Sequence, residues 1–148
     1  MATTEIIGRN VQIVQETWEI TYSELVAAAS TQSISLTTAL AYTANYPRIL
    51  LACQLETSTV FTSGSITGLT VQIGQTADTD CYLTATELLS GPPSAGVTQT
   101  PGVWRALPGG TIKALFTASG ANLGNGTATS LTAGKIKVQL IFAKYKYK

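Results

Sequence analysis

The amino-acid sequence predicts an all-β protein, an antiparallel β-sandwich or jelly roll of about seven to eight strands with one or two short helical turns. Several segments alternate apolar and polar residues, which is the pattern of a strand with one buried face. Clusters of glycine, serine and asparagine separate these segments, as expected for turns between strands. At 148 residues the chain is long enough for one domain with a substantial core.

The segment GKIKVQLIFAKYKYK, residues 134–148, has the clearest strand pattern. Its even positions from Ile136 to Phe142 are apolar and alternate with lysine and glutamine, so we expect them to fill the core. After Phe142 the lysines take the even positions and the tyrosines the odd ones. A one-residue shift in a strand turns every side chain to the opposite face. We therefore expect either a bulge or, as the favoured alternative, a tail that leaves its own core beyond Ala143.

The N-terminal part begins with an arm, residues 1–10, followed by a strand-like segment at residues 11–22. Trp18 shares one phase with the apolar residues at positions 14, 20 and 22, whereas Val11 and Ile13 lie in the other phase. The segment therefore contains a second phase change, and no turn residues separate its two parts. A helical turn is predicted within residues 22–30, with Ser23 as its N-cap, and a further strand for residues 31–38.

The rest of the chain supplies the remaining strands, which we predict at residues 48–56, 66–74 and 111–119. The second of them is followed by a polar loop with Asp78 and Asp80. Thr84 and Glu87 have the spacing of a capping box and predict a short helix that ends near Ser90. Residues 91–110 hold four of the five prolines and are predicted to form a long loop around Trp104. The resulting division is an N-terminal arm and strand at residues 1–20, a candidate for contacts between subunits, a sandwich domain at residues 21–143, and a tail at residues 144–148.

Charge is scarce and unevenly distributed. Only 11% of the residues are charged, against roughly 25% in an ordinary soluble domain. Residues 1–90 hold all eight acids and two arginines, a net charge of −6, and residues 91–148 have a net charge of +7. A solvated lysine edge is one interpretation, and complementarity between different faces of adjacent copies is the other. DNA binding is disfavoured, because the lysines follow one strand and its tail instead of forming a broad patch with interleaved arginines.

The residue types limit the available chemistry. The sequence has no histidine, so the usual general base and the commonest metal ligand are missing. Asp78, Thr79 and Asp80 offer oxygen ligands suited to calcium, but aspartates on a polar loop more often cap a turn. We therefore predict no catalytic residue, no metal site and no cofactor.

Two cysteines are present, without a Cys-x-x-Cys pattern. Cys53 is in phase with the apolar residues of its strand, so we expect a buried free thiol. A disulfide to Cys81 is the alternative. The N-terminus lacks the regions of a signal peptide, and no apolar run approaches the ~20 residues of a membrane span. We expect synthesis in a cytoplasm and a chain that stays soluble.

Four segments occur in order along the chain: YSELVAAASTQSISL, PRILLACQLETSTVFTSGSITGLTVQIGQTADTDCYL, GGTIKALFTASGANL and SLTAGKIKVQLIFA. Together they resemble a group of small β-sandwich virion proteins of tailed bacteriophages, over about residues 20–143. The matching positions are Tyr22, Leu25, Ala27, Ala28, Gly74, Asp78, Asp80, Leu131, Gly134 and Val138. The resemblance implies a jelly roll or related sandwich used as a capsid decoration (cement), neck or tail component. It implies structural roles for the matching residues and brings no active site.

On this resemblance we expect a non-enzymatic virion protein, made in the host cytoplasm, that decorates the phage head. Its expected partners are the major capsid protein or other virion proteins, and it is expected to form a homo-oligomer, with a trimer favoured. No membrane and no specific nucleic acid are expected as partners. The alternative is a carbohydrate-binding or other tail-, neck- or fibre-associated β-sandwich module, in which Trp104 and the loop around it would bind a sugar.

Contacts between subunits are expected through aromatic and charged residues of the two terminal segments and the long loop. The candidate interface residues are Glu16, Trp18, Glu19, Trp104, Lys144, Tyr145, Lys146 and Tyr147.

Overall fold

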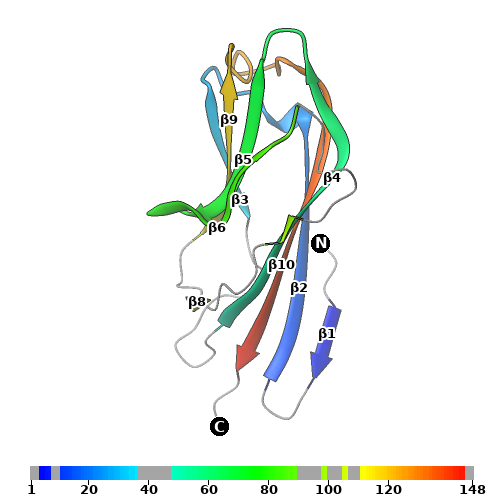
Figure 1. Cartoon of the computed structure of the whole chain (residues 1–148), viewed down its shortest axis with the longest axis vertical. Helices are drawn as coiled ribbons and strands as arrows, with labels where there is room; N and C mark the ends of the chain where they lie inside the picture. The colour runs from blue at the N-terminus through cyan, green and yellow to red at the C-terminus, as the bar shows by residue number, and fades with distance from the viewer. Residues whose placement is uncertain are drawn as a thin grey trace.

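Two antiparallel β-sheets face each other in the computed structural model shown in Figure 1. The structure describes residues 4–7, 11–36, 48–89, 98–99, 105–106 and 111–145, and describes side chains within residues 11–36, 50–89 and 111–143. We call the six-stranded sheet the first sheet and the four-stranded sheet the second sheet. The first sheet is the longer of the two, and its lower half extends beyond the second sheet (Figure 1).

The first sheet has the order β1-β2-β10-β4, and the short strands β7 and β8 both pair with the other edge of β4. Its strands are β1 (Thr4–Ile7), β2 (Val11–Thr21), β10 (Leu131–Tyr145), β4 (Arg48–Ser63), β7 (Thr98–Gln99) and β8 (Arg105–Ala106). The second sheet has the order β3-β9-β5-β6, and its strands are β3 (Thr31–Leu36), β9 (Ile112–Ser119), β5 (Gly68–Gln75) and β6 (Asp78–Glu87).

From β2 onward the chain crosses between the sheets at every connection except β5–β6 and β7–β8. With β7 and β8 together in the place of one strand, this is the connectivity of a jelly roll. The predicted antiparallel sandwich is therefore confirmed. The described residues form ten strands instead of the expected seven or eight, because β1, β7 and β8 have only four, two and two residues. Segments this short carry no readable alternation.

The core lies between the sheets and is built from the apolar phase of the long strands. The expected inward positions of β10, from Ile136 to Phe142, are fully buried, as are Leu69, Val71 and Ile73 of β5. In β9 the pattern of alternate burial matches the predicted apolar face. These assignments follow from the period of two, because successive side chains of a strand point to opposite faces.

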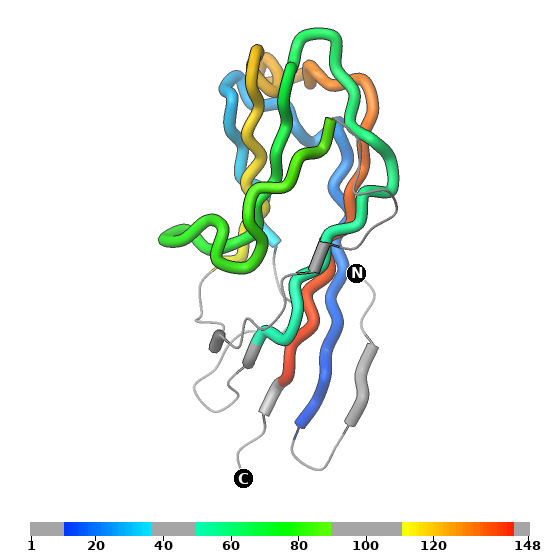
Figure 2. The backbone as a smooth tube through the Cα atoms, in the orientation of Figure 1, coloured from blue at the N-terminus to red at the C-terminus, as the bar shows by residue number. Residues whose placement is uncertain are grey.

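At the phase change after Phe142 the strand β10 continues as far as Tyr145, and the tail beyond it lies outside the described residues. Strand β10 stays paired with β2 without interruption, from Lys135 opposite Thr21 to Tyr145 opposite Val11. The register shift at this point lies in the β10–β4 pairing, between Ile141 and Phe142. The odd positions of β10 thus continue along one face of the sheet, and what changes is their chemistry. In Figure 2, β10 lies between β2 and the beginning of β4.

The two predicted helical turns have different outcomes. A 3-10 turn is present at Tyr22–Glu24, and its N-cap is Thr21, where Ser23 was expected. The backbone N–H of Thr21 donates to the Glu24 carboxylate at 2.7 Å. The helix predicted near Ser90 is wrong, because the segment from Asp78 to Glu87 is strand β6, and the first aspartate of the predicted loop already belongs to it.

Glu87, which was expected to cap that helix, closes the end of β6 instead. Its Oε1 accepts the backbone N–H groups of Leu69 at 3.1 Å and Leu89 at 2.9 Å. A carboxylate can satisfy backbone donors at the end of a strand as well as at a helix N-terminus, so the capping-box spacing alone does not distinguish the two.

Cys53 is a free thiol that is 1% exposed, as predicted, and no disulfide joins it to the partly buried Cys81. It stands opposite Leu140 in the ladder between β4 and β10. Burial raises the pKa of the Cys53 thiol to about 12, and the nearby Cys81 adds to the shift. Because the thiolate is the reactive form, the folded protein should keep Cys53 inert.

Replacing Leu140, which is fully buried, with alanine should lower the free energy of unfolding by about 2–5 kcal/mol, because a cavity remains in the core. Chemical denaturation measures this loss. Gln139→Ala is the matched control, since Gln139 is the preceding residue on the opposite, partly exposed face. Its effect should stay below about 1 kcal/mol. Equal losses in the two variants would contradict the assignment of the inward face.

Thiol titration at pH 8 should label Cys53 only after denaturation, because its pKa is raised from 9.0 to about 12 and its side chain is 1% exposed. The Cys81→Ser variant isolates this thiol. Because the pKa of Cys53 is higher in the folded protein, the unfolded chain loses the thiol proton at lower pH than the folded chain does. Ionisation of Cys53 should therefore lower the free energy of unfolding as the pH rises from 9.0 towards 12. Rapid labelling of the folded Cys81→Ser variant would refute the prediction.

Candidate functional site

The outer face of the first sheet, which points away from the core, divides into a charged part and an apolar part. In the charged part, Lys137 of β10 stands opposite Glu19 of β2 on one side and Glu56 of β4 on the other. Its Nζ lies 4.0 Å from a carboxylate oxygen of each. Lys135 Nζ approaches Glu19 Oε2 to 2.7 Å. This row of alternating charge links three strands across the sheet.

These ion pairs explain part of the charge asymmetry seen in the sequence. The Lys135 ammonium donates a hydrogen bond to the Glu19 carboxylate, and this bond and the charges of Lys135 and Lys137 hold the pKa of Glu19 below its usual value of 4.5, although desolvation opposes the shift. The acidic and basic halves of the chain therefore meet inside one molecule at this point. Because the groups are substantially exposed, solvent and salt screen the attraction, and its main effect is on register and surface charge.

Further along the same face the side chains become apolar. The ladder places Gln15, Ile141 and Ala52 in one row, and Ile13 and Ala143 in the next. We call Val11, Ile13, Ala52, Ile141 and Ala143 the apolar end of the outer face. Ala52 and Ala143 are 5% and 2% exposed, whereas Val11, Ile13 and Ile141 remain partly exposed.

The apolar end accounts for both phase changes in the sequence. The odd positions of β2 that broke its pattern, Val11 and Ile13, lie beside the odd positions of β10 that broke its pattern. In the backbone ladder Tyr145 stands opposite Val11, and Ile6 of β1 stands opposite Ile13. Sequence reasoning missed Ile13 and Ile141 as surface candidates. A signal for them was present in the sequence, because the alternation of apolar and polar residues breaks at odd positions in both β2 and β10. Such a shared break indicates two strands that are apolar on both faces and that pair with each other.

The predicted interface residues are distributed over different environments. Glu16 is fully buried on the inward face, opposite Leu140. Trp18 is partly buried against the hydrophobic core. Glu19 is exposed and paired with lysines of its own chain. Among these three, only Glu19 therefore offers an exposed charge to a neighbouring molecule.

Two of the remaining interface candidates lie at the end of β10. The backbone of Lys144 and Tyr145 belongs to the strand and is paired with Gln12 and Val11. Trp104, Lys146 and Tyr147 lie outside the described residues.

Among the described residues, no group of three or more histidine, cysteine, aspartate or glutamate side chains lies close enough together to hold a metal ion. Asp78 and Asp80 are both exposed at the start of β6. In the part of the chain that the structure describes, no helix is long and apolar enough to cross a membrane.

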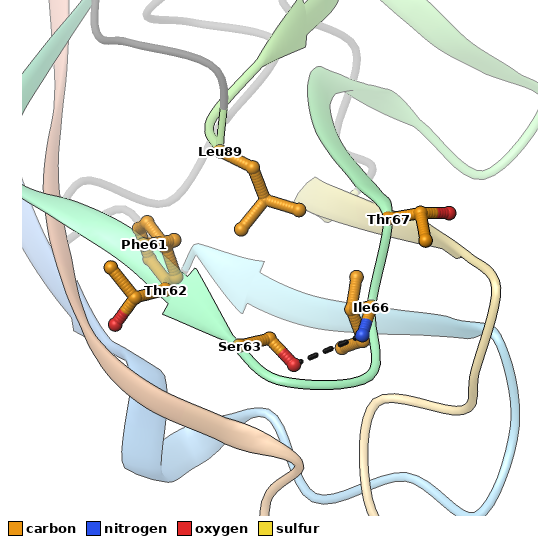
Figure 3. Close-up of a pocket in the computed structure, with 6 residues that line it drawn as sticks. All are labelled: Phe61, Thr62, Ser63, Ile66, Thr67 and Leu89. Carbon is orange, nitrogen blue, oxygen red and sulfur yellow. Dashed lines mark hydrogen bonds between the residues drawn. The ribbon is translucent and has the colours of Figure 1, made fainter.

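An open hollow of about 340 Å³ lies at one end of the sandwich (Figure 3). Its lining consists of Phe61, Thr62, Ser63, Ile66, Thr67 and Leu89. The Ser63 hydroxyl is already used by the fold, since its Oγ donates to the carbonyl of Ser130 at 2.9 Å and accepts the N–H of Ile66 at 3.0 Å. A hollow lined only by apolar and hydroxyl side chains has no group able to act as a general acid or base at neutral pH.

The comparisons with known proteins point to the fold. The sequence matches no protein-family model and no curated protein. Its structure is similar to a chain of the cyanophage Pam1 capsid asymmetric unit, with a TM-score of 0.58 and 16% sequence identity, over 99% of this chain and 94% of that chain. At this identity the similarity establishes a shared fold over nearly the whole length of both chains.

Proposed function

We propose that the protein is a non-enzymatic structural component of a tailed-phage virion, a head decoration (cement) protein that binds capsid subunits and acts as a homo-oligomer, with a trimer favoured. The observation that carries the proposal is the apolar end, a partly exposed apolar surface on a jelly roll that shares its fold with a chain of a phage capsid. The sequence resemblance to small virion sandwiches supports the same proposal independently.

The apolar end has the properties of a docking surface. An apolar patch exposed on a monomer is often a site of interaction with another protein. Ala52 and Ala143 lie beside Ile141 and Ile13 on this face, and an apolar sheet face suits close packing against a second protein layer. Strand β10 carries one apolar face into its own core and, at Ile141 and Ala143, a second one outward. We assign this outer surface to contact with the major capsid protein.

The composition supports a scaffold role over catalysis. With no histidine in the sequence, a Ser-His-Asp or Cys-His arrangement is ruled out. The low charged fraction, 11%, suits a surface covered by neighbouring subunits better than one that diffuses freely.

The test compares particles assembled with and without the protein. Purified protein should co-pellet with capsids that lack it, negative-stain images should show added density on the head, and the decorated particles should resist heating better. Failure to bind capsids, together with binding to a glycan array that is lost in Trp104→Ala, would favour the carbohydrate-binding alternative.

The double variant Ile13→Thr/Ile141→Thr should weaken capsid binding by on the order of tenfold to thirtyfold, because each isoleucine contributes about 1 kcal/mol of apolar burial at the contact. Threonine keeps the β-branched shape that strands favour, so the melting temperature should change little. Quantitative co-pelleting measures the affinity.

The matched control is Gln54→Thr/Gln139→Thr, two paired positions in the row between the charged part and the apolar end. Capsid binding by this control should equal that of the unmodified protein. An equal loss of binding in both double variants, or none in either, would contradict the assignment of the apolar end.

A further inference from the structure

Strand β3 is an edge of the second sheet. Its six residues, Thr31 to Leu36, pair with β9 in one continuous register, and no described strand lies on its other side. Figure 1 shows β3 at the border of the sheet, next to β9. The backbone N–H and C=O groups along such an edge can accept a further strand from another chain.

The other sheet edges carry features that oppose such an addition. Strand β6, the opposite edge of the second sheet, contains Asp78 and Asp80 and pairs irregularly with β5. At the edges of the first sheet, β1 has four residues, and β7 and β8 have two each. Charge, irregular pairing and short length are the usual means by which proteins protect an edge. Strand β3 has six residues, no charged residue, no proline and no register shift, so it lacks these protections.

The register determines which backbone groups of β3 point to its free side. The N–H of Ala118 donates to the carbonyl of Ser30, one residue before the strand, at 2.7 Å. In an antiparallel pair, residues that bond to the partner strand alternate with residues that direct both backbone groups away from it. Thr31, Ser33 and Ser35 therefore direct their N–H and C=O groups away from β9.

The side chains of β3 leave room for an incoming strand. Thr31, Ser33 and Ser35 are exposed, and each has a small hydroxyl side chain. Between them, Gln32 and Ile34 are half-buried, and Ile34 packs against the hydrophobic core. No bulky or charged side chain of β3 thus stands beside its outward backbone groups.

Hydrogen bonds to neighbouring segments hold this edge in one conformation. Gln32 Oε1 accepts the N–H of Ala27 at 2.9 Å, and Gln32 Nε2 donates to the carbonyl of Glu24 at 2.7 Å. The N–H of Leu123 donates to the carbonyl of Ala29 at 3.0 Å. An edge that is already ordered loses little conformational entropy when a partner strand binds, which favours its use as a contact element.

We propose that two copies of the protein join edge to edge at β3, in antiparallel orientation, about a two-fold axis at Ser33. In this register Ser33 stands opposite Ser33 of the second copy, and Thr31 stands opposite its Ser35. Outward backbone groups then meet outward backbone groups, and each such pair of residues can form two hydrogen bonds. The second sheets of the two copies thereby become one continuous sheet.

The side chains suit the same register. Ile34 of each copy stands opposite Gln32 of the other, and the two Ile34 residues lie diagonally across the axis, as neighbours that can interact. The contact thus covers the exposed part of Ile34. Because β3 contains no charged residue, the pairing brings no like charges of the two strands together.

This inference goes beyond the proposed function, because it names a contact between copies that needs no capsid. A two-fold contact uses the same surface on both copies, whereas a trimer closes through two different surfaces. The two contacts are therefore compatible, and trimers that also carry the β3 contact would be joined to their neighbours through it.

Cysteine cross-linking tests the register. In a Cys81→Ser background, Ser33→Cys should form a covalent dimer on mild oxidation, because directly opposed residues of a hydrogen-bonded pair have Cα atoms about 5.5 Å apart, within the range of a disulfide. Ser35→Cys alone should not, since the two copies of this residue lie more than about 13 Å apart along the strands. A mixture of the Thr31→Cys and Ser35→Cys proteins should cross-link. Ser119→Cys, at the exposed end of β9, is the control and should form no covalent dimer.

Sedimentation velocity of the full-length protein over a range of concentrations measures the association itself. Ser33→Lys should weaken it by on the order of tenfold or more, because two ammonium groups would face each other at the axis. An equimolar mixture of Ser33→Lys and Ser33→Glu should restore it, since opposite charges then meet. Ser119→Lys is the matched control and should associate like the unmodified protein. Salt should have little effect on the unmodified protein, because the contact contains no charge.

The inference is overturned by a monomer at all concentrations, by a Ser33→Cys protein that forms no covalent dimer, or by equal association of Ser33→Lys and Ser119→Lys. The cysteine variants keep the test decisive where a charged variant fails to fold. A loss of capsid binding in Ser33→Lys, with an isolated protein that is monomeric, would also overturn it and assign the β3 edge to a strand of the capsid protein. Because no capsid is present in the two main experiments, their failure leaves the proposed attachment to the head intact, and a failure of capsid binding leaves the β3 contact intact.

Discussion

The antiparallel ladder that holds β10 between β2 and β4 is the constraint on which the rest of the structure depends. The β10–β2 register is continuous over eleven residue pairs, and the period of two then decides where every side chain of both strands lies. From Val14 to Ile20 and from Ile136 to Phe142, even positions point to the core side and odd positions face outward. The charged row, the apolar end and the burial of Glu16 all follow from this one register. A slip by one residue would bury lysines and expose the apolar core phase, so the hydrophobic effect itself holds the register in place.

The outer face combines two kinds of surface that are usually found on different proteins. Around Lys137 it resembles the solvated face of an ordinary sheet, with alternating charge across three strands. Around Ile141 it resembles the inner face of a sandwich that lacks its second layer. A strand that is apolar on both sides normally lies in the middle of a packed structure. In β10 both faces are apolar only near the end of the strand, at Ile141 and Ala143. The surface that we expect a partner to cover is therefore limited to this end.

The contact proposed with the capsid is apolar, and this character suits its role. Apolar packing against the capsid is insensitive to salt and gains from the large number of copies arranged on a particle. The irregular pairing at Gly74 turns the β5–β6 hairpin out of the sandwich.

The amino-acid pattern was enough to predict the fold class, the inward phase of β5, β9 and β10, and the burial of Cys53, because strand periodicity is a local property that needs no knowledge of the partner strand. It also contained the signal of the apolar end, in the matching phase changes of β2 and β10. The three-dimensional arrangement was needed to show that these two phase changes lie side by side, that Lys144 pairs with Arg48 in the ladder, and that Glu87 closes a strand in place of a helix. The reason is that pairing joins residues far apart in the chain, and local preference contains no information about the register in which they meet.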